Sequence, residues 1–168
     1  MPANPPLPDA EQLLAVLIDR MRPTVGPNTG LVGIHTGGVW LAERLHQALG
    51  IQLPLGTLDV SFYRDDFNKK GLRRNVKSSD IPFDIDGCAV VIVDDVLYTG
   101  RTIRAAMNEL FDYGRPASIR LAALVDRGGR ELPIAAEFTG AAISVDPDQS
   151  IELARDAQGK LSLQLSRG

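Results

Sequence analysis

The feature that most constrains the fold of this chain is a short apolar run at residues 89–93, Ala-Val-Val-Ile-Val, which two aspartates follow. Four of its five residues are β-branched, a composition that favours extended backbone. Because no polar residue interrupts the run, it predicts a parallel strand that is buried on both faces. Ligands bind beyond the carboxyl ends of such strands, and Asp94 and Asp95 stand at that position.

Stretches with helical and extended patterns alternate around this central run. Helices are expected at residues 9–21, 39–49 and 102–113, and strands at 31–34, 58–62 and 119–125. This order predicts an α/β fold with a mostly parallel sheet flanked by helices. Residues 151–153 and 161–165 alternate apolar and polar side chains, which indicates a small C-terminal β-hairpin, or hood. A length of 168 residues suits one core, so residues 1–168 are interpreted as a single domain.

Composition excludes several classes of protein. The formal net charge of −3 and the pI of about 5.4 give no overall basic surface for nucleic acid or anionic lipid. Cys88 is the single cysteine, which excludes a disulfide within the chain and a cysteine-based zinc site. No segment has the roughly 20 apolar residues that a membrane helix needs. We therefore expect a soluble, cytoplasmic protein without a membrane partner.

Residues 96–102 have the properties of a phosphate-binding turn. Gly100 permits left-handed backbone, Thr99 and Thr102 supply hydroxyl donors, and the turn leads into a helix N-terminus with outward-pointing N–H groups. Asp94 and Asp95 would repel the phosphate itself but are placed to accept hydrogen bonds from ribose hydroxyls. A strand that ends in Asp-Asp is, taken alone, more often a simple helix cap. The complete arrangement from 90 to 102 favours a site for a phosphorylated ribose.

The sequence of residues 90–102 resembles the 5-phosphoribosyl-1-pyrophosphate (PRPP) motif of type I phosphoribosyltransferases. The segment Asp-Asp-Val-Leu-Tyr-Thr-Gly-Arg-Thr is similar to that of the PyrR family, pyrimidine operon attenuation proteins that are also uracil phosphoribosyltransferases. The likeness extends to residues 31–34, 63–66 and 124–133. In purine-using relatives an aspartate often stands where this chain has Tyr98, so the resemblance implies a pyrimidine acceptor.

The resemblance also implies roles for individual residues. Asp94 and Asp95 are the expected catalytic residues. The other implied sites are a ribose-phosphate loop at Val96, Leu97, Tyr98, Thr99, Gly100, Arg101 and Thr102; a pyrophosphate-binding turn at His35, Thr36, Gly37 and Gly38; a flexible lid with Arg64, Arg73 and Arg74; and a uracil site at Val125, Asp126 and Arg127.

Each of these segments also has a purely structural interpretation. The turn at 35–38 also reads as a plain glycine turn before a helix, the charges of the lid as a solvated loop, and Asp126-Arg127 as a surface pair. In the PyrR family the pyrophosphate turn commonly reads Thr-Arg-Gly, and it often has a non-proline cis peptide bond. This chain has Gly37 in place of that arginine.

The implied reaction transfers the phosphoribosyl group of PRPP to uracil, giving uridine 5'-monophosphate (UMP) and pyrophosphate. Mg²⁺ is the expected cofactor, carried by the substrate rather than by direct protein ligands. Pyrimidine operon leader RNA is a possible partner, and a homodimer or higher homo-oligomer is expected. The alternative is an RNA-binding attenuation regulator, or a nucleotide sensor with weak or lost catalysis.

Overall fold

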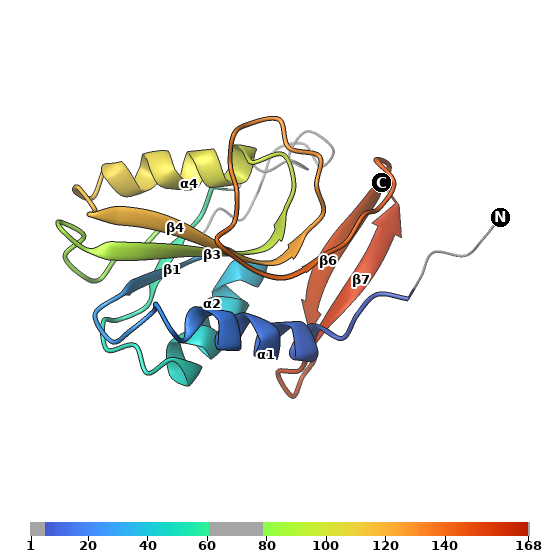
Figure 1. Cartoon of the computed structure of the whole chain (residues 1–168), viewed down its shortest axis with the longest axis horizontal. Helices are drawn as coiled ribbons and strands as arrows, with labels where there is room; N and C mark the ends of the chain where they lie inside the picture. Colours follow the sequence, from blue (N-terminus) through green and yellow to red (C-terminus); the bar gives the residue numbers. More distant parts are fainter. Residues whose placement is uncertain (1–5, 61–78, 168) are drawn as a thin grey trace.

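A five-stranded, wholly parallel sheet forms the centre of the computed structural model, which describes residues 6–60 and 79–167 (Figure 1). Its strands lie in the order β2-β1-β3-β4-β5. Their bounds are β1 Gly30–Ile34, β2 Gly56–Leu58, β3 Ala89–Leu97, β4 Ser118–Asp126 and β5 Phe138–Ala142. The α/β class expected from the sequence is confirmed.

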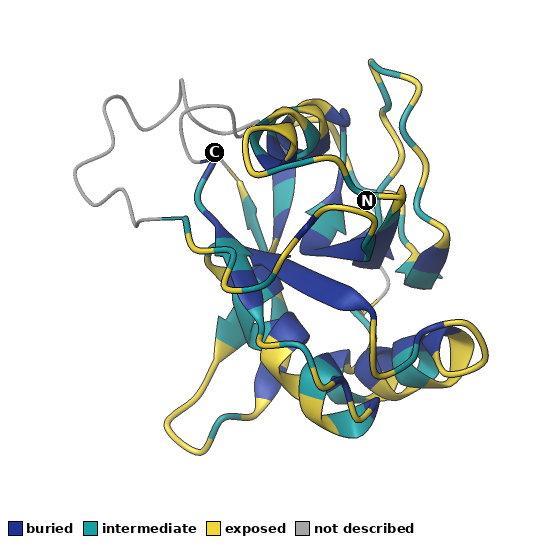
Figure 2. Cartoon of the chain, turned by 90° about the vertical axis from the view of Figure 1, so that its left-hand side faces the viewer, coloured by how far each residue is buried: buried dark blue, intermediate teal, exposed yellow. Residues whose placement is uncertain are grey.

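Helices cover both faces of the sheet. Helices α1 (Ala10–Met21) and α2 (Gly37–Ala48) lie on one face, and α4 (Arg101–Phe111) lies on the other (Figure 1). Each face of the sheet has its own hydrophobic core, and successive residues of β3 point into these two cores alternately. Val91 and Val93 pack with α1 and α2, whereas Val90 and Ile92 pack with α4. In Figure 2 the strands appear dark blue between helices whose outer sides are yellow. The uninterrupted apolar run is thus explained by burial on both faces.

The C-terminal hairpin predicted from alternating side chains is present. Strands β6 (Gln149–Arg155) and β7 (Leu161–Arg167) pair antiparallel in a separate two-stranded sheet. Ile151, Leu153 and Leu161 point into the same core as α1 and α2. The hairpin is therefore docked on the helical layer rather than added to the edge of the parallel sheet.

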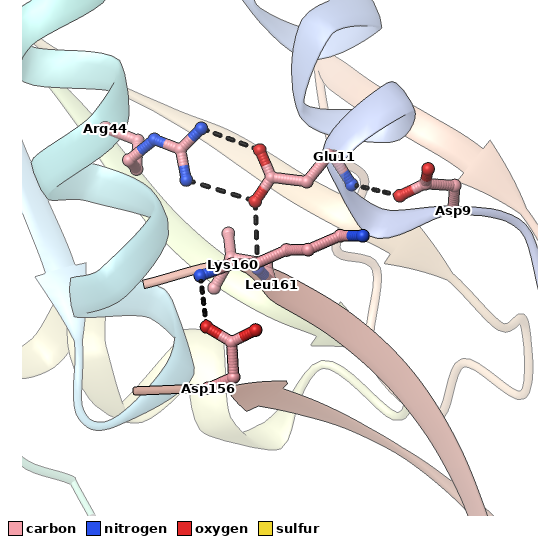
Figure 3. A network of polar contacts seen from close by, with 6 residues as sticks. All are labelled: Asp9, Glu11, Arg44, Asp156, Lys160 and Leu161. Atoms are coloured by element: carbon pink, nitrogen blue, oxygen red, sulfur yellow. Dashed lines mark hydrogen bonds and ion pairs between the residues drawn. The ribbon is translucent and has the colours of Figure 1, made fainter. Parts of the chain in front are cut away.

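A polar contact fixes this hairpin at the start of α1 (Figure 3). The carboxylate of Glu11 accepts two hydrogen bonds from the Arg44 guanidinium of α2, at 2.7 and 3.1 Å, and a third at 2.8 Å from the Leu161 N–H of β7. Hydrogen bonding from Arg44 lowers the pKa of Glu11, although burial opposes the shift. Glu11 consequently connects α1, α2 and β7.

The structure differs from the sequence prediction at three places. The central strand continues beyond Val93 to Leu97, because Val96 and Leu97 pair with Val125 and Asp126 of β4. Strand β5 was not predicted, because Phe-Thr-Gly-Ala-Ala has neither a run of β-branched residues nor a strict alternation of apolar and polar residues. The strand expected at 58–62 is observed as Gly56–Leu58, and residues 61–78 lie outside the described ranges. No helix within the described ranges is long and apolar enough to cross a bilayer.

Candidate functional site

Two turns meet at the carboxyl edge of the sheet because their strands are neighbours. Strand β1 pairs with β3 in parallel, with Gly33 opposite Val93, so the turn that follows β1 reaches the aspartates of β3. The approach is close at two glycine positions. A Cβ on Gly37 would overlap Oδ2 of Asp95, and one on Gly38 would overlap the carbonyl oxygen of Val93. The turn at 35–38 and the acidic pair, 56 to 60 residues apart in sequence, thus lie side by side.

The turn itself has an unusual backbone. The peptide bond between His35 and Thr36 is cis, the form that the family resemblance anticipates, and among the described residues no other peptide bond is cis. The His35 N–H donates to the carbonyl of Leu58 at 2.9 Å, which links the turn to strand β2. Helix α2 begins directly after it, at Gly37.

Asp94 and Asp95 are buried strand residues rather than members of an open loop. Their exposed fractions are 3% and 9%. The N–H of Asp95 donates to Oδ1 of Asp94, and the N–H of Val96 donates to Oδ1 of Asp95, each at 2.9 Å. These bonds fix the direction of both carboxylates. Buried oxygens with fixed directions are suited to accept hydrogen bonds from a sugar.

The predicted phosphate loop begins where strand β3 ends, two residues beyond Asp95. We use the term phosphate loop for residues 98–102, since Val96 and Leu97 belong to the strand. Gly100 has φ of 96°, the left-handed conformation expected from the sequence, and as the N-cap of α4 it carries no capping side chain. Thr99 and Thr102 are buried, and the Thr99 hydroxyl oxygen accepts the Arg101 N–H at 3.2 Å.

A second loop, residues 126–134, supports the phosphate loop and is called the acceptor loop below. The Arg130 guanidinium donates to three groups: Oδ2 of Asp126 at 2.6 Å, the carbonyl of Tyr98 at 2.7 Å and the carbonyl of Ile134 at 2.8 Å. The N–H groups of Glu131 and Leu132 both donate to the carbonyl of Thr99. The two loops are consequently held together by side-chain and backbone bonds.

The three residues expected to bind uracil lie at the end of β4, next to the phosphate loop. Val125 is fully buried in the core, so only its backbone is placed to face a ligand. Burial raises the pKa of the Asp126 carboxyl, but hydrogen bonds from the Arg130 guanidinium and the Gly128 N–H outweigh it and hold the pKa below its ordinary value. Asp126 therefore stays ionised beside its arginine.

Arg127 connects the acceptor loop to residues 146–149, where the C-terminal hairpin begins. Its guanidinium stacks on the Tyr98 ring, with the central carbon 3.9 Å from the ring centroid, and donates to the carbonyls of Gln149 and Asp146. Gly129 borders the same ring, since a Cβ there would lie 2.5 Å from it. The Tyr98 side chain is thus held in contact with the acceptor loop.

Neither Arg130 nor Gln149 was predicted from the sequence to belong to the site. Gln149 is buried, and its side chain accepts the Asp146 N–H at 3.0 Å. Arg130 belongs to the segment 124–133 that carried the family likeness, but no sequence spacing shows that its partner is a carbonyl 32 residues earlier. The lid residues Arg64, Arg73 and Arg74 lie outside the described ranges.

The acidic side chains at the strand end offer carboxylate oxygens, the ligand type that hard cations prefer. Within residues 6–60 and 79–167, no group of three or more histidine, cysteine, aspartate or glutamate side chains is placed to enclose a metal ion. Oδ2 of Asp95 lies beside Gly37, and Asp94 precedes it at the same strand end. Mg²⁺ binds through one or two carboxylates together with phosphates and water, and these residues fit that pattern.

Comparison with known proteins gives consistent results. The family model described as "Phosphoribosyl transferase domain" matches residues 10–150. A protein named "Bifunctional protein PyrR" from Pseudomonas paraeruginosa is 60% identical over 122 residues, covering 73% of this chain and 72% of its own. The protein of the same name from Pseudomonas savastanoi pv. phaseolicola is 55% identical over 133 residues, covering 79% and 78%.

Solved structures show the same fold at lower sequence identity. A hypoxanthine-guanine phosphoribosyltransferase from Bacillus anthracis superposes with a TM-score of 0.65 at 20% identity, over 90% of this chain and 87% of its own. The hypoxanthine phosphoribosyltransferase of Trypanosoma cruzi gives a TM-score of 0.64 at 21% identity, over 96% of both chains. At this identity the likeness concerns the fold alone.

Proposed function

The chain belongs to the PyrR family of phosphoribosyl transferases, and from this premise we propose that it transfers the phosphoribosyl group of PRPP to N1 of uracil. The products are UMP and pyrophosphate. The observation that carries the proposal is the contact of the turn at 35–38 with Asp95, because it puts the candidate pyrophosphate site beside the candidate ribose site.

Each part of the site has a distinct task in this reaction. Breaking the bond from C1' to pyrophosphate leaves positive character on the ribose ring, so the site must hold the sugar and favour departure of the leaving group. Asp94 and Asp95 accept hydrogen bonds from the ribose hydroxyls and provide negative charge near the ring. The phosphate loop binds the 5'-phosphate through N–H groups and hydroxyls. Mg²⁺, when bound with PRPP, neutralises the pyrophosphate.

Uracil is the acceptor that the sequence favours. Tyr98 stands where purine-using relatives often have an aspartate, and its ring is packed by Arg127 and Gly129. The backbone of Val125 and Asp126 lies at the adjacent strand end, where it is placed to read the polar edge of a pyrimidine. Arg127 would contribute by holding the Asp146–Gln149 segment near this position.

The decisive experiment measures pyrophosphate release from PRPP and Mg²⁺ in the presence of uracil. Release is expected with uracil, and neither hypoxanthine nor guanine should replace it. Removal of Mg²⁺ with a chelator should stop the reaction, and an excess of Mg²⁺ should restore it. PRPP binding without uracil-dependent release would instead favour a nucleotide sensor that has lost catalysis.

A regulatory function is the second candidate, because the curated relatives are named bifunctional. In this proposal the nucleotide site responds to UMP and alters binding to pyrimidine operon leader RNA. The overall charge of −3 requires a local basic surface for such binding. A gel shift that UMP strengthens and added salt weakens would support regulation, and no shift at low salt would leave the transferase alone.

We also propose that the chain forms a homodimer or higher homo-oligomer in the cytoplasm. Phe111 and Tyr113, at the end of α4, are the large apolar side chains that the described part of the chain leaves exposed. Exposed aromatic groups are common at protein interfaces. Sedimentation of the purified protein over a range of concentrations would give the size of the oligomer.

A further inference from the structure

Two consecutive carbonyl groups of the phosphate loop point toward the acceptor loop. The carbonyl of Tyr98 accepts a hydrogen bond from Nη1 of Arg130 at 2.7 Å. The carbonyl of Thr99 accepts from the N–H groups of Glu131 at 2.9 Å and Leu132 at 3.2 Å. Both peptide units are consequently fixed in direction by donors from one segment.

The direction of these carbonyls determines where the neighbouring N–H groups point. In a planar trans peptide the C=O and the following N–H point in opposite directions. Among the described residues the cis peptide bond is at His35–Thr36, so the units after Tyr98 and Thr99 are trans. The N–H groups of Thr99 and Gly100 therefore face away from the acceptor loop. Successive N–H groups on one side of a turn form a concave site for anions.

Arg130 is the side chain through which this arrangement can be tested, because the donors to Thr99 are backbone groups. Its planar guanidinium bridges three acceptors at once, which a lysine ammonium on a flexible stem reproduces poorly. The ion pair with Asp126 anchors the group at the end of β4. All of these acceptors are protein groups, so the arrangement does not require Arg130 to touch a substrate.

We propose that Arg130 is a positioning residue for the 5'-phosphate of PRPP. It turns the peptide unit after Tyr98 so that the Thr99 N–H faces the phosphate, and it links the phosphate loop to the strand end proposed to hold uracil. This inference rests on the proposed function, since it assigns the 5'-phosphate to that loop.

The experiment measures PRPP affinity by calorimetry, with Mg²⁺ present, for the wild type, Arg130→Met and Arg130→Lys. Arg130→Met keeps the volume of the side chain but removes its donors, and PRPP affinity is expected to fall at least tenfold. Arg130→Lys keeps the charge and the pair with Asp126, so it controls for a folding defect. Its PRPP affinity is expected to fall about threefold to tenfold. Ethylguanidinium should partly restore PRPP affinity in Arg130→Ala.

Arg120, in strand β4 just before the acceptor loop, provides a matched control. Its side chain is 20% exposed against 24% for Arg130, and it also makes one ion pair and a carbonyl hydrogen bond, to Glu137 and Thr24. Because Arg120 lies in the first half of β4, far along the strand from Asp126, Arg120→Met should lower the thermal midpoint while PRPP affinity stays within twofold.

The outcomes separate this inference from the proposed function. Wild-type affinity for PRPP in Arg130→Lys and Arg130→Met would overturn the positioning role, as would an equal loss in Arg120→Met. If the wild type binds PRPP and Arg130→Met does not, but uracil releases no pyrophosphate, the positioning role stands and the transferase proposal fails. A wild type that does not bind PRPP overturns both.

Discussion

The carboxylate of Asp95 occupies the space beside the Cα of Gly37, so the turn at 35–38 contacts Asp95 with no side chain between them. Oδ1 of Asp95 is fixed by the Val96 N–H, which leaves Oδ2 toward the turn. An arginine at position 37, common in the family, would require the Asp95 side chain to move. The glycine and the direction of Asp95 are therefore one structural feature of this chain.

Replacing Gly37 with alanine is expected to displace Asp95 and to lower uracil-dependent turnover about tenfold or more. Overpacking costs roughly 1–3 kcal/mol, and the helix preference of alanine offsets up to about 1 kcal/mol of it, so most of the protein should stay folded. Steady-state kinetics and thermal unfolding measure the two effects. Gly26→Ala is the control, since its added Cβ meets no atom within 4 Å. Unchanged turnover in Gly37→Ala would show that the position of Asp95 is not critical.

Asp95→Asn tests the charge of the same side chain without changing its size. The amide oxygen can still accept the Val96 N–H, so the free energy of unfolding should change by less than about 1.5 kcal/mol. Turnover is expected to fall about 100-fold because negative charge beside the ribose ring is lost. Chemical denaturation and pyrophosphate release measured on one preparation compare the two. Equal activity of mutant and wild type would remove Asp95 from the catalytic assignment.

The sequence predicted those features that follow from local pattern. The apolar run at 89–93 indicated the central strand, Gly100 indicated the left-handed turn before α4, and alternating side chains indicated the hairpin. Each of these depends on residues close together along the chain. The order of motifs also identified the family that the comparisons then showed.

Features that depend on partners distant in sequence were not predictable from one sequence. The extension of β3 through Asp94 and Asp95 depends on pairing with β4, and the close contact at Gly37 involves a side chain 58 residues later in the sequence. Arg130 was inconspicuous for the same reason, since a carbonyl partner leaves no mark in the sequence. The predicted roles of the site residues stay predictions until the variants are measured.

The contact of Glu11 with Arg44 and Leu161 predicts a pH-dependent part of the stability. The folded-state pKa of Glu11 lies below its ordinary value of 4.5, chiefly through the Arg44 hydrogen bond. Such a carboxylate stabilises the fold above the unfolded-state pKa, and this contribution is lost as the pH falls through the folded-state pKa. Glu11→Gln should therefore lower the thermal midpoint at about pH 7, and the difference from wild type should shrink as the pH falls below 4.5.

Glu43→Gln is the control for this pH series, because Glu43 forms a longer and more exposed pair with Arg155 at 3.7 Å. Exposed ion pairs contribute about 0–1 kcal/mol, so Glu43→Gln should have the smaller effect at neutral pH. Thermal unfolding followed by circular dichroism at several pH values gives both curves. Parallel curves for wild type and Glu11→Gln would contradict a contribution from Glu11 ionisation.

Arg127→Met is expected to loosen the segment before the hairpin and to weaken uracil binding. The variant loses the hydrogen bonds to the carbonyls of Asp146 and Gln149 and the stacking on Tyr98, while its side chain still fills much of the space. Hydrogen exchange should accelerate at residues 146–149, and the KM for uracil should rise about threefold to tenfold, as for the loss of one hydrogen bond of ordinary strength. The affinity for PRPP should change less, since Arg130 still holds the Tyr98 carbonyl.

Arg155→Met is a fitting comparison for Arg127→Met, because Arg155 also stacks on an aromatic ring, that of Trp40, at 4.7 Å. Its contacts lie on α2 rather than at the strand end, so exchange at 146–149 and the KM for uracil should stay near wild-type values. If Arg127→Met accelerated exchange but left the KM for uracil unchanged, the arginine would hold the hairpin without shaping the uracil site. Because the two readouts report different contacts of one side chain, they decide between a structural and a substrate-positioning role.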